Sequence, residues 1–168
     1  MVTRVRFATH DDIPAIQQIA RHTWARTYAG LIPEPVQQDF LDSAYSREAL
    51  ARRLGSPLLR TWVAEQNERV VGYLILYLPD EPASRPPELA AIYVLPEAQG
   101  QGHGRALFQR LLEECRRSGV ETLSVAVHRD NWPSRRWYER RGFIYDHDTV
   151  AWNNIPEAVY RLKVQVEG

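Results

Sequence analysis

The hydrophobic and polar side chains at the start of the chain first follow the period of a strand and then that of a helix. Residues 2–8 place apolar and polar side chains at every second position, which is the period of a strand. The helix is expected to start after Asp11 or Asp12 and to end at Gly30, because acidic residues cap helices and glycine commonly follows the last turn. Its apolar stripe comprises Ile13, Ile16, Ala20, Trp24 and Tyr28.

Shorter helices and a hairpin are expected next. Residues 33–41 and 47–54 carry apolar side chains at helical spacing. Residues 60–66 and 69–78 are rich in β-branched, aromatic and other apolar side chains, which is typical of strands. They flank the dipeptide at 67–68, so we expect the two strands to form a hairpin that turns there.

The rest of the chain predicts strands and helices that alternate. A proline-rich loop over 79–87 leads into them. Strands are expected at 89–95, 122–127, 143–152 and 159–166, and helices at 102–118 and 131–141. Because hairpins are combined with one strand–helix–strand crossover, this order predicts an α+β fold with a mixed sheet. No segment is long enough to act as a linker, so residues 1–168 are expected to form a single domain.

The overall charge indicates no polyanionic macromolecular partner. The chain holds 21 basic and 21 acidic residues, so neither nucleic acid nor a membrane is an expected partner. The single cysteine excludes an internal disulfide. No signal peptide is visible, and the longest apolar run, 70–78, is too short to cross a bilayer. The histidines lack metal-ligand spacing, so a cytoplasmic protein without a metal is expected.

A glycine-spaced turn stands between an apolar run and an amphipathic helix. Gly100, Gly102 and Gly104 follow the strand expected at 89–95. Glycines leave main-chain N–H groups uncovered and the start of a helix favours negative charge, so the segment predicts a phosphate or diphosphate site. A P-loop is excluded because the only lysine in the chain is Lys163. The dinucleotide fingerprint is also excluded, because the glycines do not occupy its first, third and sixth places.

The pattern that does fit this segment is Gln-x-x-Gly-x-Gly, found at Gln99, Gly102 and Gly104. It resembles the acetyl-CoA signature of the GNAT superfamily of N-acetyltransferases. The resemblance extends to further positions in the right order, namely Glu88, Val94, Asn131, Tyr138, Gly142 and Phe143. It implies a mixed, mostly antiparallel central sheet flanked by helices, with acetyl-CoA as the co-substrate.

In this superfamily the pantetheine arm of the cofactor lies along the central strand and uses its main-chain hydrogen bonds. By resemblance, that role falls to Ile92, Tyr93 and Val94. The diphosphate would contact the N–H groups of the turn, which Gln99 would help to order. The turn comprises Gly100, Gln101, Gly102, His103, Gly104 and Arg105. Asn131 would hydrogen-bond the cofactor arm, and it also fits the position of a helix N-cap.

Two side chains are candidates for the proton transfers that acetyl transfer requires. A primary amine has a pKa of about 10 and needs a base. Glu88 matches the base of the histone-acetylating members, and a solvated residue at a strand end is its alternative reading. Tyr138 is the candidate acid for the departing thiolate, and a packing tyrosine beside Trp137 is the alternative. Other members carry a glutamate where this chain has Ala126, so Glu88 or water must act as the base.

The acceptor is expected to be an amine bound by the first two helices and the loop before the central strand. Residues 40–50 resemble the polyamine-acetylating branch of the superfamily. Several carboxylates can neutralise a polycation, namely Asp39, Asp42, Asp80, Glu81 and Glu88. The alternatives are a peptide N-terminus, a small amine such as an aminoglycoside, and a sensor that binds acetyl-CoA without catalysis. The sequence leaves the oligomeric state open, with a homodimer as one option.

Overall fold

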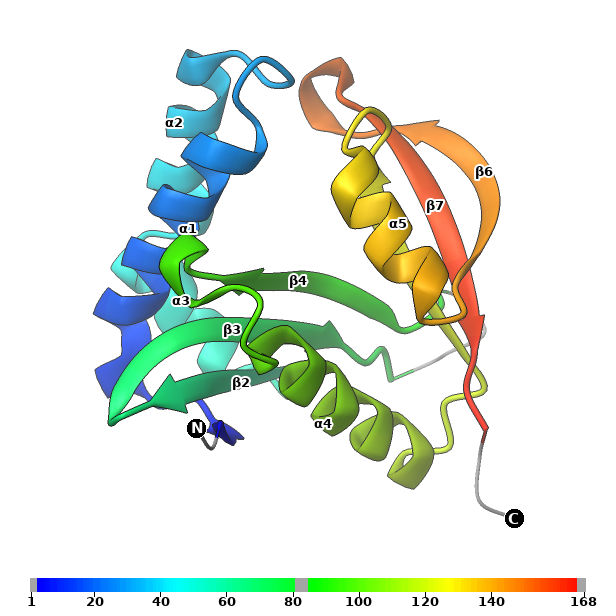
Figure 1. The fold of residues 1–168 in the computed structure, drawn as a ribbon, viewed down its shortest axis with the longest axis horizontal. Coiled ribbons are helices and arrows are strands. Elements are labelled where there is room, and N and C mark those ends of the chain that lie inside the picture. Colours follow the sequence, from blue (N-terminus) through cyan, green and yellow to red (C-terminus); the bar gives the residue numbers. More distant parts are fainter. Residues whose placement is uncertain (1–2, 81–84, 166–168) are drawn as a thin grey trace.

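The computed structural model describes residues 3–80 and 85–165 (Figure 1). Three parts of the sequence predictions lie outside the described residues. They are the expected strand ends at Val2 and Val166 and residues 81–84 of the expected loop, which include the candidate Glu81. The helices are α1 (Ile13–Thr27), α2 (Glu34–Ala44), α3 (Arg47–Leu54), α4 (His103–Arg117) and α5 (Trp132–Arg140). The strands are β1 (Arg4–Phe7), β2 (Leu59–Gln66), β3 (Arg69–Tyr77), β4 (Glu88–Val94), β5 (Thr122–His128), β6 (Ile144–Val150) and β7 (Pro156–Lys163). None of the described helices combines the length and the apolar character that a membrane crossing requires.

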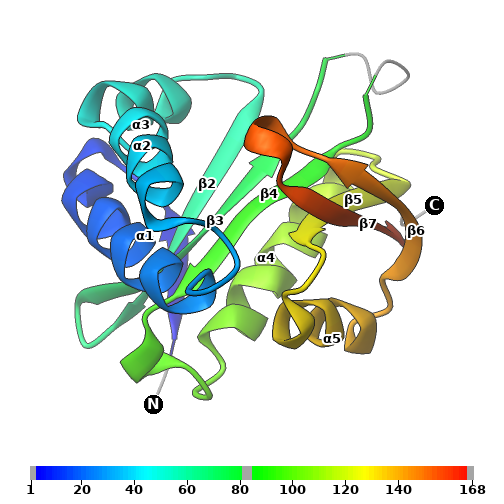
Figure 2. The same cartoon turned by 90° about the horizontal axis from the view of Figure 1, so that it is seen from above.

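The strands form one 7-stranded sheet in the order β1-β2-β3-β4-β5-β7-β6. Every neighbouring pair is antiparallel except β4 and β5, which run parallel. Helices α1, α2 and α3 lie on one face of the sheet, and α4 and α5 lie on the other (Figure 2). The prediction of an α+β fold with a mixed, mostly antiparallel sheet flanked by helices is therefore confirmed.

The expected hairpin is confirmed, and the expected last strand is wrong at both ends, since it already stops at Lys163. Asn67 and Glu68 have φ angles of 52° and 65°, the left-handed pair that a type I′ turn requires. Strand β7 begins at Pro156 rather than at residue 159, because Glu157 and Ala158 already pair with β5 and β6. A strand that is paired on both sides extends as far as its partners do, and the alternation pattern alone does not reveal that.

The start of α1 differs from the expected acidic cap. Asp12 stands immediately before the helix, but its carboxylate makes no capping bond to the first turn. It accepts two hydrogen bonds from the Arg6 guanidinium and one from the Thr9 N–H. The acidic residue therefore ties the helix to strand β1, and a short 3-10 turn at His10–Asp12 precedes the helix.

Strands β4 and β5 are joined at a single point. Their pairing consists of Glu88 opposite Ser124, and beyond this pair the two strands diverge. The sheet is therefore split between its fourth and fifth strands, and the split widens towards the ends of β4 and β5. This feature was not predicted from the sequence.

A bulge in β4 changes which side chains share a face. Ile75 pairs with Ala91 and Leu76 pairs with Leu89, so Ala90 is left unpaired. Leu89 and Ile92 consequently pack on the same core, although they are three residues apart. Ala91 and Tyr93 pack on the opposite face.

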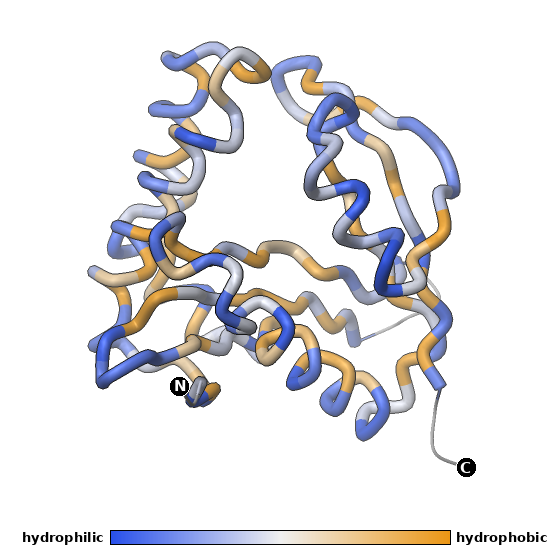
Figure 3. Tube along the Cα trace, in the orientation of Figure 1, coloured by the Kyte–Doolittle hydropathy of each residue, from blue (hydrophilic) through white to orange (hydrophobic). Residues whose placement is uncertain are grey.

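Separate hydrophobic cores fill the two faces of the sheet. The core beneath α4 contains Leu74, Leu107, Leu123 and Tyr160, and the core beneath α1–α3 contains Ile16, Leu41 and Tyr73. Cys115 is fully buried in the first of these cores, where burial raises the pKa of its thiol. Figure 3 shows the middle strands coloured mainly as hydrophobic, whereas α5 is largely hydrophilic. The polar helix α5 is thus suited to border a cavity.

Candidate active site

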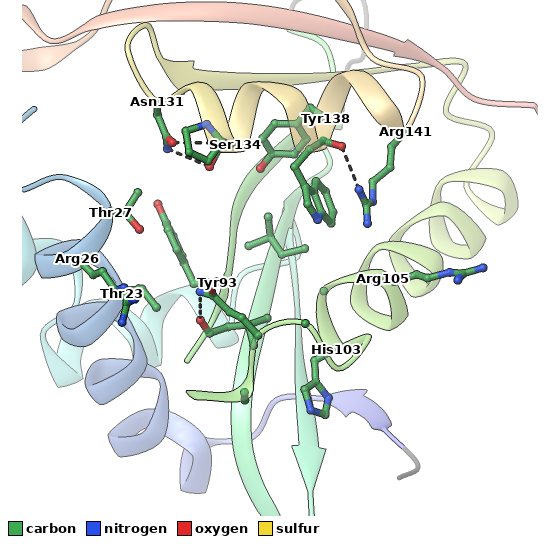
Figure 4. Close-up of a pocket in the computed structure, with 18 of the residues that line it drawn as sticks. Thr23, Arg26, Thr27, Tyr93, His103, Arg105, Asn131, Ser134, Tyr138 and Arg141 are labelled. Atoms are coloured by element: carbon green, nitrogen blue, oxygen red, sulfur yellow. Dashed lines mark hydrogen bonds between the residues drawn. The ribbon is translucent and has the colours of Figure 1, made fainter. Parts of the chain in front are cut away.

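A cavity of about 760 Å³ opens beside the end of β4, between α1 and α5. Figure 4 shows Asn131 and Tyr138 on one side of this cavity and Thr27 and Tyr93 across from them. The cavity brings together most of the predicted site residues: Ile92, Tyr93, Val94, Gln99, Gly100, Gly102, His103, Gly104, Arg105, Asn131 and Tyr138. Gln101 and Glu88 are not part of its lining.

The glycine turn presents a row of open amides to the cavity. Within the described residues, none of the N–H groups of residues 100–105 has a hydrogen-bond acceptor. Gly100 and Gly102 have φ angles of +77° and +88°, a conformation that L-residues with side chains rarely adopt. The side chain of Gln99 donates a 3.0 Å hydrogen bond to the Val94 carbonyl and so ties the turn to β4. These amides stand at the start of α4, where the helix dipole favours an anion.

Unpaired arginines line the same cavity. Arg26, Arg105 and Arg141 have no acidic partner among the described residues. Burial lowers the pKa of Arg141, and the positive charges of Arg105 and Arg140 lower it further. Arg141 stacks on Trp137, with 3.4 Å between the guanidinium carbon and the ring centroid. Cations that repel each other in this way favour a ligand with several negative charges.

The residues present fit the diphosphate of a coenzyme A molecule. A Cβ atom added to Gly100 or Gly102 would meet no protein atom within 4 Å, so the space over the turn is open. A Cβ atom on Gly104 would contact Trp137 at 3.6 Å, which is an ordinary contact distance. Open amides, open space and unpaired arginines are together the features that a phosphorylated carrier requires.

Tyr138 combines a buried ring with an unbonded hydroxyl. The residue is 8% exposed, and its ring packs against Trp137 and Phe143. Its hydroxyl has no hydrogen-bond partner in the described part of the protein, and the residue lines the cavity. Burial raises the pKa of the phenol above its ordinary value. Tyr138 therefore holds a proton that is available to a group inside the cavity.

Asn131 is the N-cap of α5. Its side-chain oxygen accepts the Ser134 N–H at 3.3 Å, and its side-chain nitrogen donates to the Ser134 hydroxyl at 2.9 Å. The reading of Asn131 as a helix cap is confirmed. The side-chain oxygen retains a second lone pair that can accept a hydrogen bond. Its contact with a cofactor stays a prediction.

Three predicted residues have environments that the sequence did not indicate. Glu88 lies at the far end of β4 from the glycine turn and pairs with Arg85 at 3.1 Å. The Gln101 side chain hydrogen-bonds Gln66 at 2.6 Å, outside the cavity lining. His103 is 3% exposed, and burial lowers the pKa of its imidazole, so the ring is neutral at pH 7. The roles of these residues remain predictions.

Side chains that the sequence reading did not single out also line the cavity. Thr23, Arg26 and Thr27 project from α1. Their spacing of three and four residues places them on one helix face, which was a usable signal. Trp137 and Arg141 come from α5 and the residue after it, and their contribution depends on how α5 lies against the split sheet. No local pattern marks that arrangement.

A split mixed sheet, open amides at a helix start and an unbonded phenol in the same cavity define a transferase that uses an anionic carrier. The family model described as "Acetyltransferase (GNAT) family" matches residues 16–143. The chain therefore belongs to the GNAT family, and it is an N-acetyltransferase, as the names of its relatives also indicate.

Several relatives and a solved structure resemble the chain along most of its length. It is 33% identical to the N-acetyltransferase YuaI of Bacillus subtilis, covering 97% of this chain and 90% of that protein. Identity is 32% with the L-methionine sulfoximine/L-methionine sulfone acetyltransferase of Salmonella typhimurium, covering 83% and 78%. The chain is 24% identical to the spermidine N(1)-acetyltransferase of Thermoplasma acidophilum, over 95% of this chain and 99% of that protein. The crystal structure of the PaiA N-acetyltransferase from T. acidophilum in complex with coenzyme A superimposes with a TM-score of 0.85, at 20% identity, covering 97% and 99%.

Proposed function

We propose that this protein transfers the acetyl group of acetyl-CoA to a primary amine of a polyamine, by direct attack in a ternary complex. One observation carries the proposal: the open N–H groups of Gly100 and of residues 102–105 and the unbonded hydroxyl of Tyr138 belong to one cavity. A single site thus offers an anion-binding end and a proton-donating end. The coenzyme A complex of the structurally similar PaiA protein supports the choice of carrier.

The binding roles follow from charge and from free main-chain groups. The amides of residues 100–105 and the side chains of Arg105 and Arg141 hold the phosphates. The main chain of Ile92 to Val94 aligns the arm of the carrier, and one of its N–H groups stabilises negative charge on the acetyl oxygen. When bound, acetyl-CoA supplies the activated thioester.

Two side chains move the protons. Glu88 takes a proton from the ammonium form of the acceptor, directly or through water, and so frees the lone pair of the nitrogen. Tyr138 gives its proton to the sulfur as the carbon–sulfur bond breaks, and it regains one from solvent. The raised pKa of Tyr138 keeps this proton in place until the sulfur carries negative charge. The side chain of Glu88 pairs with Arg85 at 3.1 Å and is 26% exposed, so water can reach it.

The nature of the acceptor is supported by relatives and by charge. The spermidine N(1)-acetyltransferase of T. acidophilum aligns over 95% of this chain. Among the candidate carboxylates, Asp39 and Asp80 are exposed to an approaching polycation. Asp42 already pairs with Arg21 at 3.2 Å. An amino-acid-like amine is the second candidate, favoured by the 32% identity with the L-methionine sulfoximine/L-methionine sulfone acetyltransferase.

A binding measurement followed by a turnover panel tests the proposal. Acetyl-CoA at saturation should raise the melting temperature. Thiol release should then be measured with spermidine, L-methionine sulfone, an N-terminal peptide and an aminoglycoside. Turnover with the peptide or the aminoglycoside but not with spermidine would remove the polyamine acceptor. A melting shift without thiol release from any amine would favour the sensor, and the absence of a shift would remove acetyl-CoA as the carrier.

A further inference from the structure

Glu157 is a carboxylate that the proposed mechanism leaves without a role. It stands near the start of β7 and is half-buried. In the described part of the chain it has neither a hydrogen-bond donor nor a cationic partner. The buried Asp12, by contrast, is held by two hydrogen bonds from Arg6. A half-buried carboxylate without a partner is unfavourable for folding, so it is a candidate for contact with a ligand.

The position of Glu157 in the sheet directs it toward helix α1. Glu157 lies directly opposite His128 in the antiparallel pairing of β7 with β5, so the two side chains share a face. Their chain neighbours Val127 and Ala158 pack into the core beneath α4, so Glu157 and His128 lie on the other face. There the imidazole of His128 faces the ring of Tyr28, the residue that follows α1, with 6.5 Å between the ring centroids.

The same face continues to the candidate active site. The hydroxyl of Tyr28 lies 3.0 Å from that of Tyr93, which lines the cavity. Leu89 packs into the core beneath α4, so its neighbour Glu88 is on the α1 side as well. Glu157, Glu88 and Tyr93 therefore lie on the same face of the sheet, with Glu88 and Tyr93 on β4 and Glu157 on β7, across the split between β4 and β5.

The groups around Glu157 leave its negative charge uncompensated. Burial and then the charge of Glu88 raise the pKa of Glu157 above its ordinary value. The Nδ1 atom of His128 accepts the Asp130 N–H at 3.1 Å, so this nitrogen is not a donor to Glu157. Burial raises the pKa of Tyr28, which remains neutral. Among the described residues no cation pairs with Glu157, and Glu88 pairs with Arg85, whose side chain is 61% exposed, so the carboxylate of Glu157 makes this face negative.

We propose that Glu157 binds a positively charged group of the amine acceptor and thereby selects the acceptor class. This inference rests on the proposed acetyltransferase function and extends it to a specificity residue. An ammonium group gains a charge-assisted hydrogen bond at Glu157 and relieves its repulsion with Glu88. The carboxylate of a free amino acid would be repelled by the carboxylates of Glu157 and Glu88, so such an acceptor is disfavoured. Diamines and polyamines are therefore the acceptors that fit, and amino acids are rejected.

The kinetic test compares Glu157→Gln with a matched loss of charge elsewhere. Glu113→Gln removes an exposed carboxylate from α4, whose only ion pair within residues 3–80 and 85–165 is with Arg110 at 3.4 Å. Glu157→Gln should raise the KM for spermidine about tenfold or more and affect kcat less. It should also reduce the preference for spermidine over L-methionine sulfone. Glu113→Gln should change neither quantity, and both variants should keep the melting shift produced by acetyl-CoA.

A melting measurement separates binding from folding and does not depend on turnover. Because the raised pKa means that the ionised carboxylate disfavours the folded state, Glu157→Gln should melt no lower than the wild type at pH 7. Spermidine added with coenzyme A should raise the melting temperature of the wild type and not that of Glu157→Gln. Equal spermidine shifts and equal KM values in both proteins would overturn the role of Glu157 while leaving the acetyltransferase function intact. No acetyl-CoA shift and no thiol release would instead overturn the proposed function.

Discussion

The phenolic oxygens of Tyr28 and Tyr93 lie 3.0 Å apart and join helix α1 to the end of strand β4. A second pair lies beside them, in which Tyr73 donates a 2.8 Å hydrogen bond to Tyr45 at the end of α2. The rings of Tyr73 and Tyr93 link the two pairs, with centroids 5.8 Å apart. Burial raises the pKa of each of these phenols, so all four are neutral donors or acceptors. The row fixes the first two helices against the strand that lines the cavity.

The tyrosine pair should be energetically coupled. Tyr28→Phe or Tyr93→Phe leaves one buried hydroxyl without its partner, which should cost about 1–2 kcal/mol of unfolding free energy. The double variant removes both hydroxyls, so it should lose less than the sum of the two single losses. Urea unfolding of the four proteins measures the coupling. Additive losses would mean that each hydroxyl is satisfied without the other.

Tyr138→Phe should separate catalysis from binding. The hydroxyl has no protein partner in the described structure, so its removal should barely change stability. If it is the acid for the thiolate, kcat should fall about 100-fold or more, while the melting shift by acetyl-CoA persists. Tyr160→Phe is the matched control, because the Tyr160 hydroxyl is bonded to Arg135 at 2.9 Å and Glu139 at 3.0 Å. The control should lose stability and keep its kcat, and an unchanged kcat in Tyr138→Phe would remove this residue from the mechanism.

Local chemistry in the chain predicted most of the elements and the glycine turn. Gly100 and Gly102 have the positive φ angles that only glycine adopts easily, so their spacing identifies the turn without knowledge of the fold. The hairpin at Asn67 and Glu68 was identified instead by the strand-like segments on either side of this dipeptide. Such features depend on a few consecutive residues, and a sequence displays them directly.

Features that depend on how strands meet were not predictable. The bulge at Ala90 and the single pairing of β4 with β5 arise from contacts between segments that are distant in sequence. Glu157 became a candidate only when the pairing of β7 placed it opposite His128. The register of one strand against another decides which side chains share a face, and no periodicity within one strand specifies that register.

Gly102→Ala should test the open turn. An L-residue held at a φ angle of +88° costs about 1–2 kcal/mol, and the new methyl group would stand in the space over the turn. Gly119→Ala is the matched control, since Gly119 has a φ angle of +72°, no atom within 4 Å of the added Cβ, and a position after the far end of α4. Both variants should lose similar stability, and only Gly102→Ala should weaken acetyl-CoA binding in a titration. Equal affinities in the two variants would remove the turn from the binding site.

The ion pair between Arg6 and Asp12 should make the free energy of unfolding depend on pH in the acid range. Burial opposes ionisation of Asp12, but hydrogen bonds from Arg6 and from the Thr9 N–H outweigh it and hold the pKa of this carboxylate below its ordinary value. A lowered folded-state pKa means that the stabilisation is fully present above the unfolded-state value of about 4 and is lost as pH falls through the folded-state value. Asp12→Asn should therefore lower the unfolding free energy by about 3 kcal/mol at pH 7, and by less at pH 3.

Urea unfolding at both pH values measures the difference. The exposed Asp42→Asn serves as a control that should change the unfolding free energy by about 0.5 kcal/mol or less. An Asp12→Asn loss of the same size at pH 7 and pH 3 would show that the ionised carboxylate is not the source of the stabilisation.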